Sequence, residues 1–132
     1  MLKKKNRLTW KDINFLIKKQ NMIYWKYFSF FYFKQYPNRY YNQYSLQLPI
    51  KLSKKAVYRN FVKRVVFDYI NSTWLINKRF NSSYYKIFII FNKKEIEKLK
   101  ETIETKEKKL IKDTIIKNFR FSFNNLINKL WK

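Results

Sequence analysis

The hydrophobic and polar positions of the chain begin with the pattern of a short amphipathic helix, which we expect over residues 9–20. Thr9 and Asp12 have the spacing of a capping box, in which each side chain accepts a hydrogen bond from the backbone N–H of the other residue. Apolar side chains then recur three and four residues apart, so they share one face of the helix. They are Ile13, Leu16 and Ile17. This face predicts a helix that docks on a sheet.

Three later segments have the composition or the alternation of β-strands. Residues 22–33 form an almost unbroken run of aromatic and β-branched side chains, which favours one extended strand, and Pro37 follows as a breaker. Residues 43–48 alternate polar and apolar side chains, the pattern of a sheet with one buried face. Residues 84–91 are apolar on both faces, which predicts a central strand.

Helical patterns occupy the rest of the chain. Residues 56–70 place apolar side chains on one side of a helix and basic or amide side chains in i,i+4 pairs on the other. Residues 93–118 interleave Glu and Lys with apolar positions, which predicts a long amphipathic helix. Its apolar positions are Ile96, Leu99, Ile103 and Leu110. A separate short helix is expected over 122–131, with Ser122 as its N-cap.

These elements follow the order α-β-β-α-β-α, with the 93–118 helix as an insertion near the C-terminus. The order predicts an α/β fold, an α+β sandwich with a small sheet. A chain of 132 residues is long enough for one core and short for two, so we expect a single domain over residues 1–132.

The charge of the chain is strongly positive, because 31 Lys and Arg residues face only 8 Asp and Glu residues, for a net +23. All the acidic residues except Asp12 and Asp68 lie between positions 95 and 113, where lysines balance them. The other residues, including a basic arm over 1–8, therefore hold the whole excess. Such an excess indicates a polyanionic partner that binds outside the neutral segment.

The residues that the chain lacks exclude several function classes. With no His and no Cys, the common zinc sites, thiolate nucleophiles and the usual general base near neutral pH are missing, so we expect no catalytic residues, cofactor or small-molecule substrate. No apolar run is long enough to span a bilayer, and no signal-peptide pattern follows the charged N-terminus. We expect a cytoplasmic protein, or one of an organelle matrix if an organelle encodes it.

The most specific motif is a basic loop that leads into a helix, Lys54-Lys55-Ala56-Val57-Tyr58-Arg59-Asn60-Phe61-Val62-Lys63-Arg64. It resembles the signature of the bacterial ribonuclease P protein family. Segments similar to the other elements of the family precede and follow it in the same order, over about 7–91 and 120–131. The family usually has basic residues where this chain has Phe61 and Phe67.

This resemblance implies a left-handed β-α-β crossover that places the cationic helix beside a cleft in the sheet. The helix and its loop would contact the catalytic RNA through Lys51, Lys54, Lys55, Arg59, Asn60, Lys63 and Arg64. The cleft would hold the single-stranded 5′ leader of precursor tRNA against Ile13, Ile17 and Phe31. The chemistry would belong to the RNA and its Mg²⁺, so the protein would be a non-catalytic subunit of this endoribonuclease.

Other classes fit parts of the sequence. A structural ribosomal protein would share the charge, the size and the basic arm, although it would not explain the order of the motifs. A peripheral membrane protein would use basic and aromatic residues at an anionic surface. The motif alone also fits an ordinary solvated helix face, and most of the aromatic run fits a sheet core.

Overall fold

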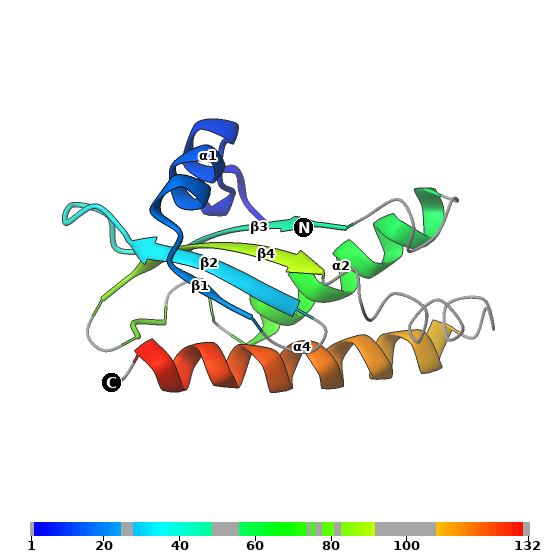
Figure 1. Ribbon diagram of the computed structural model, residues 1–132. Helices are drawn as coiled ribbons and strands as arrows, with labels where there is room; N and C mark the ends of the chain where they lie inside the picture. Colours follow the sequence, from blue (N-terminus) through cyan, green and yellow to red (C-terminus); the bar gives the residue numbers. More distant parts are fainter. Residues whose placement is uncertain are drawn as a thin grey trace.

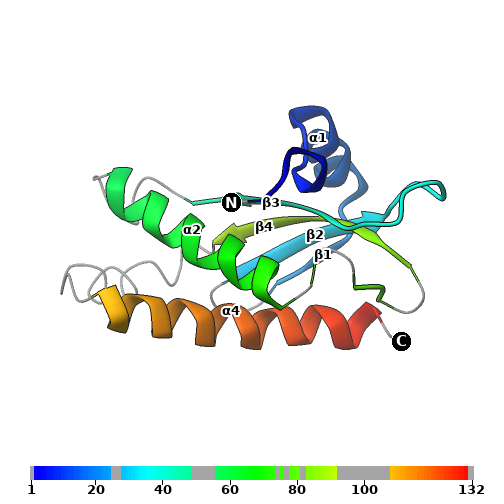
Figure 2. The same cartoon turned by 180° about the vertical axis from the view of Figure 1, so that it is seen from behind.

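The computed structural model describes residues 2–24, 28–48, 56–73, 75, 78–80, 83–91 and 108–130. In chain order the elements are η1 (Lys4–Asn6), α1 (Trp10–Lys19), β1 (Met22–Ile23), β2 (Phe28–Lys34), β3 (Gln43–Gln47), α2 (Ala56–Ser72), β4 (Tyr85–Phe91) and α4 (Lys108–Leu130). The strands form one sheet in the order β1-β2-β4-β3. Helix α1 packs on part of one face, and α2 and α4 cover the other (Figure 1; Figure 2 from behind).

Helix α1 begins with the capping box that the sequence predicts. The Thr9 hydroxyl accepts a hydrogen bond from the Asp12 N–H at 3.2 Å, and the Asp12 carboxylate accepts one from the Thr9 N–H, also at 3.2 Å. Ile13 and Leu16 are buried against the sheet, whereas Ile17, expected on the same face, is 44% exposed. The helix therefore docks through a narrower stripe than its sequence predicts.

The prediction of one strand over residues 22–33 is wrong. Two antiparallel strands, β1 and β2, lie within this region, and their register places Met22 opposite Phe31 and Ile23 opposite Phe30. A uniform run of aromatic and β-branched residues favours extended backbone along its whole length. It does not show where the chain changes direction.

The α/β fold class is confirmed by the unit β3–α2–β4. Strands β3 and β4 are parallel, with Ser45 opposite Phe88, and β2 pairs antiparallel with the other side of β4. A parallel pair requires a crossover connection, and α2 is part of it. The left-handed sense of this crossover stays a prediction.

The C-terminal region forms one long helix over the part that the structure describes, so the separate helix with Ser122 as its N-cap is wrong. Ser122 lies buried within α4, and Leu110, expected in the apolar stripe, is exposed. The buried stripe is Ile111, Ile115, Phe119, Phe123, Leu126 and Leu130. Its spacing of three and four residues continues past Ser122, which explains why the helix does not end there. Residues 93–107 of the predicted inserted helix lie outside the described residues.

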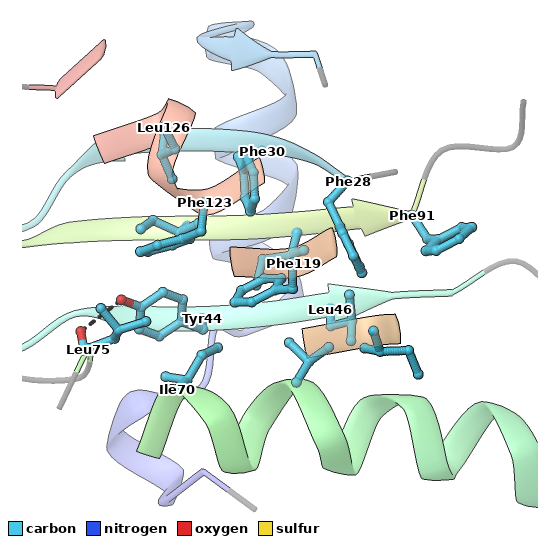
Figure 3. Packing of buried hydrophobic residues seen from close by; sticks show 14 of the residues in the cluster. Phe28, Phe30, Tyr44, Leu46, Ile70, Leu75, Phe91, Phe119, Phe123 and Leu126 are labelled. Atoms are coloured by element: carbon cyan, nitrogen blue, oxygen red, sulfur yellow. Dashed lines mark hydrogen bonds between the residues drawn. The ribbon is translucent and has the colours of Figure 1, made fainter. Parts of the chain in front are cut away.

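Aromatic side chains fill the main core between the sheet and its two long helices (Figure 3). The Phe119 ring contacts Phe28 edge to face at 5.4 Å and lies 5.5 Å from the Phe123 ring, between centroids. The hydroxyl of fully buried Tyr44 donates a hydrogen bond to the Leu75 carbonyl at 2.8 Å. Burial raises the pKa of Tyr44 above its usual value, so this hydroxyl stays a donor.

Candidate nucleic-acid interface

Helix α2 has one side in the main core and one side turned outward. Its buried residues are Val62, Val65, Val66 and Ile70. On the outward side, Asn60 and Arg64 are exposed, and Arg59 and Lys63 are half-buried. We call these last four residues the cationic side of α2. Their i,i+4 spacing places three positive charges and one amide on a single helix face, an arrangement suited to phosphate groups.

Two aromatic residues of α2 stand where the ribonuclease P protein family is usually basic. Phe61 and Phe67 are half-buried and pack against the main core. At these positions the helix therefore adds apolar contact in place of charge. The predicted RNA-binding residues Lys51, Lys54 and Lys55 lie outside the described residues.

The three predicted cleft residues gather near α1, but their environments differ. Ile13 is only 8% exposed and belongs to a second buried cluster between α1 and the sheet. Phe31 is half-buried on the edge of that cluster, and its ring stacks on Phe88 with centroids 6.3 Å apart. Ile17 is not part of the cluster and is exposed. Ile13 is thus a packing residue, while Phe31 and Ile17 present accessible apolar surface.

Part of the sheet face that carries α1 is not fully covered. Phe31, Phe88 and Ser45 are direct neighbours across three strands and therefore share this face. On this face, Ser45 and Ile90 are half-buried, and Gln47 is exposed. We call Phe31, Ser45, Gln47 and Ile90 the open strip. The strip combines apolar surface with polar groups, and β3, the strand that precedes α2, forms one side of it.

A partly buried ion pair links α1 to the sheet. The Lys86 ammonium, in a side chain only 3% exposed, lies 2.8 Å from an Asp12 carboxylate oxygen and 4.1 Å from the centroid of the Tyr36 ring. Burial tends to raise the pKa of Asp12, but hydrogen bonds from Lys86 and Thr9 and the charge of Lys86 outweigh it and hold this pKa below its usual value. The sequence analysis did not single out Lys86, although it is the one cation in the apolar run of β4.

The acidic residues of the described chain do not gather in one place. Asp12 is paired with Lys86, Asp68 lies on α2, and Asp113 lies on α4. The described residues contain no group of three or more His, Cys, Asp or Glu side chains that could hold a metal ion. In that same part of the chain, no helix has the length and apolar character needed to cross a membrane.

Comparison with known proteins adds support at the level of the fold. No family model matches the chain, and no curated protein matches it in sequence. The fold is similar to that of a solved RNase P protein from Thermotoga maritima, with a TM-score of 0.57 over 81% of this chain and 90% of that chain. The two sequences are 18% identical, so the likeness establishes the fold alone. The α/β architecture around the β3–α2–β4 unit is thus one that a ribonuclease P protein also adopts.

Proposed function

We propose that the chain is the RNA-binding protein subunit of a ribonuclease P, which assists a catalytic RNA in removing the 5′ leader from precursor tRNA. One observation carries the proposal. The motif that resembles the family signature supplies the cationic side of α2, within a fold similar to that of an RNase P protein. Side chains define the motif, and the backbone path defines the fold in which the motif lies.

The charge of the chain suits an RNA partner. Lys and Arg neutralise phosphates without reading sequence, and the counterions that they displace make such binding strongly salt-dependent. A net charge of +23 would also lessen the repulsion between two RNA molecules brought together on one protein. The partners in this proposal are the catalytic RNA, which contacts α2, and precursor tRNA.

The open strip suits a single strand. Exposed bases stack on aromatic side chains in a way that tolerates any sequence, and Phe31 offers a partly accessible ring beside the polar Ser45 and Gln47. In this proposal the leader lies along the strip, next to exposed Ile17 of α1. The protein contributes positioning to the reaction, while the RNA and its Mg²⁺ contribute the chemistry.

The RNA that accompanies the protein in its native cells tests this function. Affinity-tagged protein is purified from those cells, and the bound RNA is sequenced. We expect enrichment of one structured, non-ribosomal RNA that cleaves precursor tRNA at its 5′ end when combined with the pure protein and Mg²⁺. Enrichment of ribosomal RNA, or a recovered RNA without this activity, would contradict the proposal.

A further inference from the structure

A pocket at one end of the sheet has the chemistry of a second nucleic-acid contact. It lies where the loop 35–42 joins β2 to β3, the cyan loop at the left of Figure 1, whereas α2 begins at the opposite end of the sheet. Its volume is about 320 Å³, within the range of small-molecule sites. The cationic and aromatic residues that line it are Lys34, Tyr36, Arg39, Tyr40, Arg79 and Tyr84. We call this site the loop pocket.

Buried glutamines give the loop a fixed shape. The Gln35 side-chain amide donates hydrogen bonds to the Gln43 side-chain oxygen at 3.0 Å and to the Tyr41 carbonyl at 3.3 Å. The Gln35 backbone N–H donates to the Tyr84 carbonyl at 2.9 Å, and Arg39 donates to the same Gln43 oxygen at 3.3 Å. A pocket ordered in this way needs little further ordering when a ligand binds.

Two kinds of aromatic contact occur in the pocket. The Tyr36 ring contacts two cations, since Arg39 is 4.9 Å and Lys86 4.1 Å from its centroid, and its contact with Arg39 helps to hold that guanidinium in place. Tyr40 is different: it is 73% exposed, and its one ring contact within the described residues is an edge-to-face contact with Tyr84 at 6.4 Å. Tyr40 therefore presents a positioned aromatic ring to solvent.

The lining combines three cationic side chains, from Lys34, Arg39 and Arg79, with tyrosine rings, and no acidic residue of the described chain lines it. Cations select an anion, guanidinium groups favour phosphate, and an exposed ring favours a flat partner. A nucleotide of a single strand joins a phosphate to a flat base. An isolated anion would pair with the cations but would leave the exposed Tyr40 ring without a stacking partner.

We propose that the loop pocket binds one unstacked nucleotide of single-stranded nucleic acid, whose base stacks on Tyr40 and whose phosphate pairs with Arg39 and Arg79. This contact is additional to α2 and to the open strip. The seven residues of β4 span about 23 Å, so the loop pocket and the start of α2 mark two separated points of contact. The inference does not depend on ribonuclease P, because any single strand supplies the nucleotide.

Equilibrium binding of a fluorescent ten-nucleotide uridine RNA to the full chain tests the pocket. Tyr40→Ala should weaken binding on the order of tenfold, the loss of one stacked base, without changing the salt dependence because no charge is removed. Arg79→Gln should weaken binding and lower the slope of log affinity against log salt by about one.

Matched controls separate binding in the pocket from general electrostatic attraction and from nonspecific contact with exposed aromatic rings. Tyr24→Ala removes an exposed tyrosine beyond β1, toward the Phe28 end of β2 and away from the loop, and it should leave the affinity unchanged. Arg120→Gln removes an exposed arginine of α4 and should weaken binding less than Arg79→Gln.

Two results would overturn the proposal. One is an equal effect of pocket and control variants on the uridine strand, which would mean binding by diffuse charge. The other is an equal effect of Tyr40→Ala on the single strand and on an RNA duplex of the same charge, since a duplex offers no unstacked base. Circular dichroism confirms that each variant is folded. The free protein is sufficient for every measurement, so failure to find ribonuclease P activity would leave this test intact.

Discussion

The two faces of the sheet are both rich in aromatic side chains, yet they are buried to very different degrees. Along β2, Phe28 and Phe30 point toward α4 and are almost fully buried. Phe31 and Phe33 point the other way, toward α1, and are half-buried. Strand β2 thus places phenylalanines on both faces, and the difference in their burial comes from the elements that cover each face.

Helix length explains this difference. The 23 residues of α4 extend about 35 Å, longer than the seven-residue strands at about 23 Å, whereas the ten residues of α1 extend only about 15 Å. α4 can cover the full length of one face, with α2 beside it. α1 is too short to cover the other, and the open strip is what it leaves. Aromatic residues on the first face stabilise the fold, whereas Phe31 and Phe33 on the second face keep partly accessible rings.

The largest expected effect is the loss of a core ring on the α4 face. Phe119→Ala should lower the free energy of unfolding by about 3–5 kcal/mol, because the Phe119 ring lies fully buried among aromatic neighbours. Urea titration followed by circular dichroism measures the change. Phe121→Ala, two positions along the same helix at a 60% exposed residue, is the control and should change stability by less than about 0.5 kcal/mol. Similar losses in both variants would contradict the burial assigned to α4.

The second prediction concerns the ion pair that fixes α1 on the less covered face. Asp12→Asn should lower stability by about 3 kcal/mol at neutral pH, because it leaves the Lys86 ammonium buried without its carboxylate. The asparagine oxygen can still accept the Thr9 N–H, so the helix cap is retained. Lys86→Met, which removes the buried charge itself, should be milder.

The pH dependence of protein stability gives a second test of the same ion pair. The folded-state pKa of Asp12 lies below its usual value of 3.8. The ionised carboxylate therefore contributes fully to the free energy of unfolding above the pKa of the unfolded state. This contribution is lost as the pH falls through the pKa of the folded state. The stability difference between wild type and Asp12→Asn should therefore shrink below about pH 4. A difference that stays constant down to pH 2 would show that the charge of Asp12 does not stabilise the protein.

The sequence predicted those parts of the fold that depend on local pattern. The capping box placed the start of α1, period-two alternation placed β3, and the apolar run placed β4 at the centre of the sheet. The motif also placed the cationic side of α2 on the outward side of a helix. Each depends on neighbours within a few positions, where propensity and periodicity are strong.

The parts that the sequence did not predict depend on distant partners. Ser122 is a weak helix former and was expected as an N-cap, but burial of Phe119 and Phe123 against the sheet overrides that propensity. Asp12, the partner of Lys86, lies 74 positions away in the chain, and the Gln43 side-chain amide donates a hydrogen bond to the Lys5 carbonyl, 38 positions away. No local pattern pairs such residues. The loop pocket was missed for the same reason, since Arg79 meets the 35–42 loop only after the sheet forms.

The third prediction tests whether the open strip holds the leader. Phe31→Ala should lower stability by about 2 kcal/mol, less than Phe119→Ala, because Phe31 is only half-buried. In the particle reconstituted with the co-purified RNA, it should weaken precursor tRNA binding by about 1–3 kcal/mol, the range for one stacked base. Mature tRNA lacks the leader, so its affinity should hardly change. An equal loss for both tRNAs, in protein shown to be folded at the assay temperature, would exclude the strip as a leader site.

The smallest effect on stability is expected on the cationic side of α2, which belongs to neither sheet face. Replacing Lys63 and Arg64 together with Ala should change stability by less than about 1 kcal/mol, since one side chain is exposed and the other half-buried. Binding to the co-purified RNA should nevertheless weaken, and the slope of log affinity against log salt should fall by about two, one for each lost phosphate contact.

A matched pair on α4 shows whether position or charge matters in this last test. Lys112→Ala with Lys129→Ala removes the same charge from exposed positions, so general electrostatic attraction falls equally. If α2 contacts the RNA directly, the α4 pair should leave the salt slope nearly unchanged, because long-range attraction to exposed charges is already screened at physiological salt. Unlike Phe31→Ala, the α2 pair should weaken precursor and mature tRNA complexes alike, since both require an assembled particle. Equal slopes for the α2 and α4 pairs would mean that the protein binds as a diffuse cation, and α2 would then have no special place in the interface.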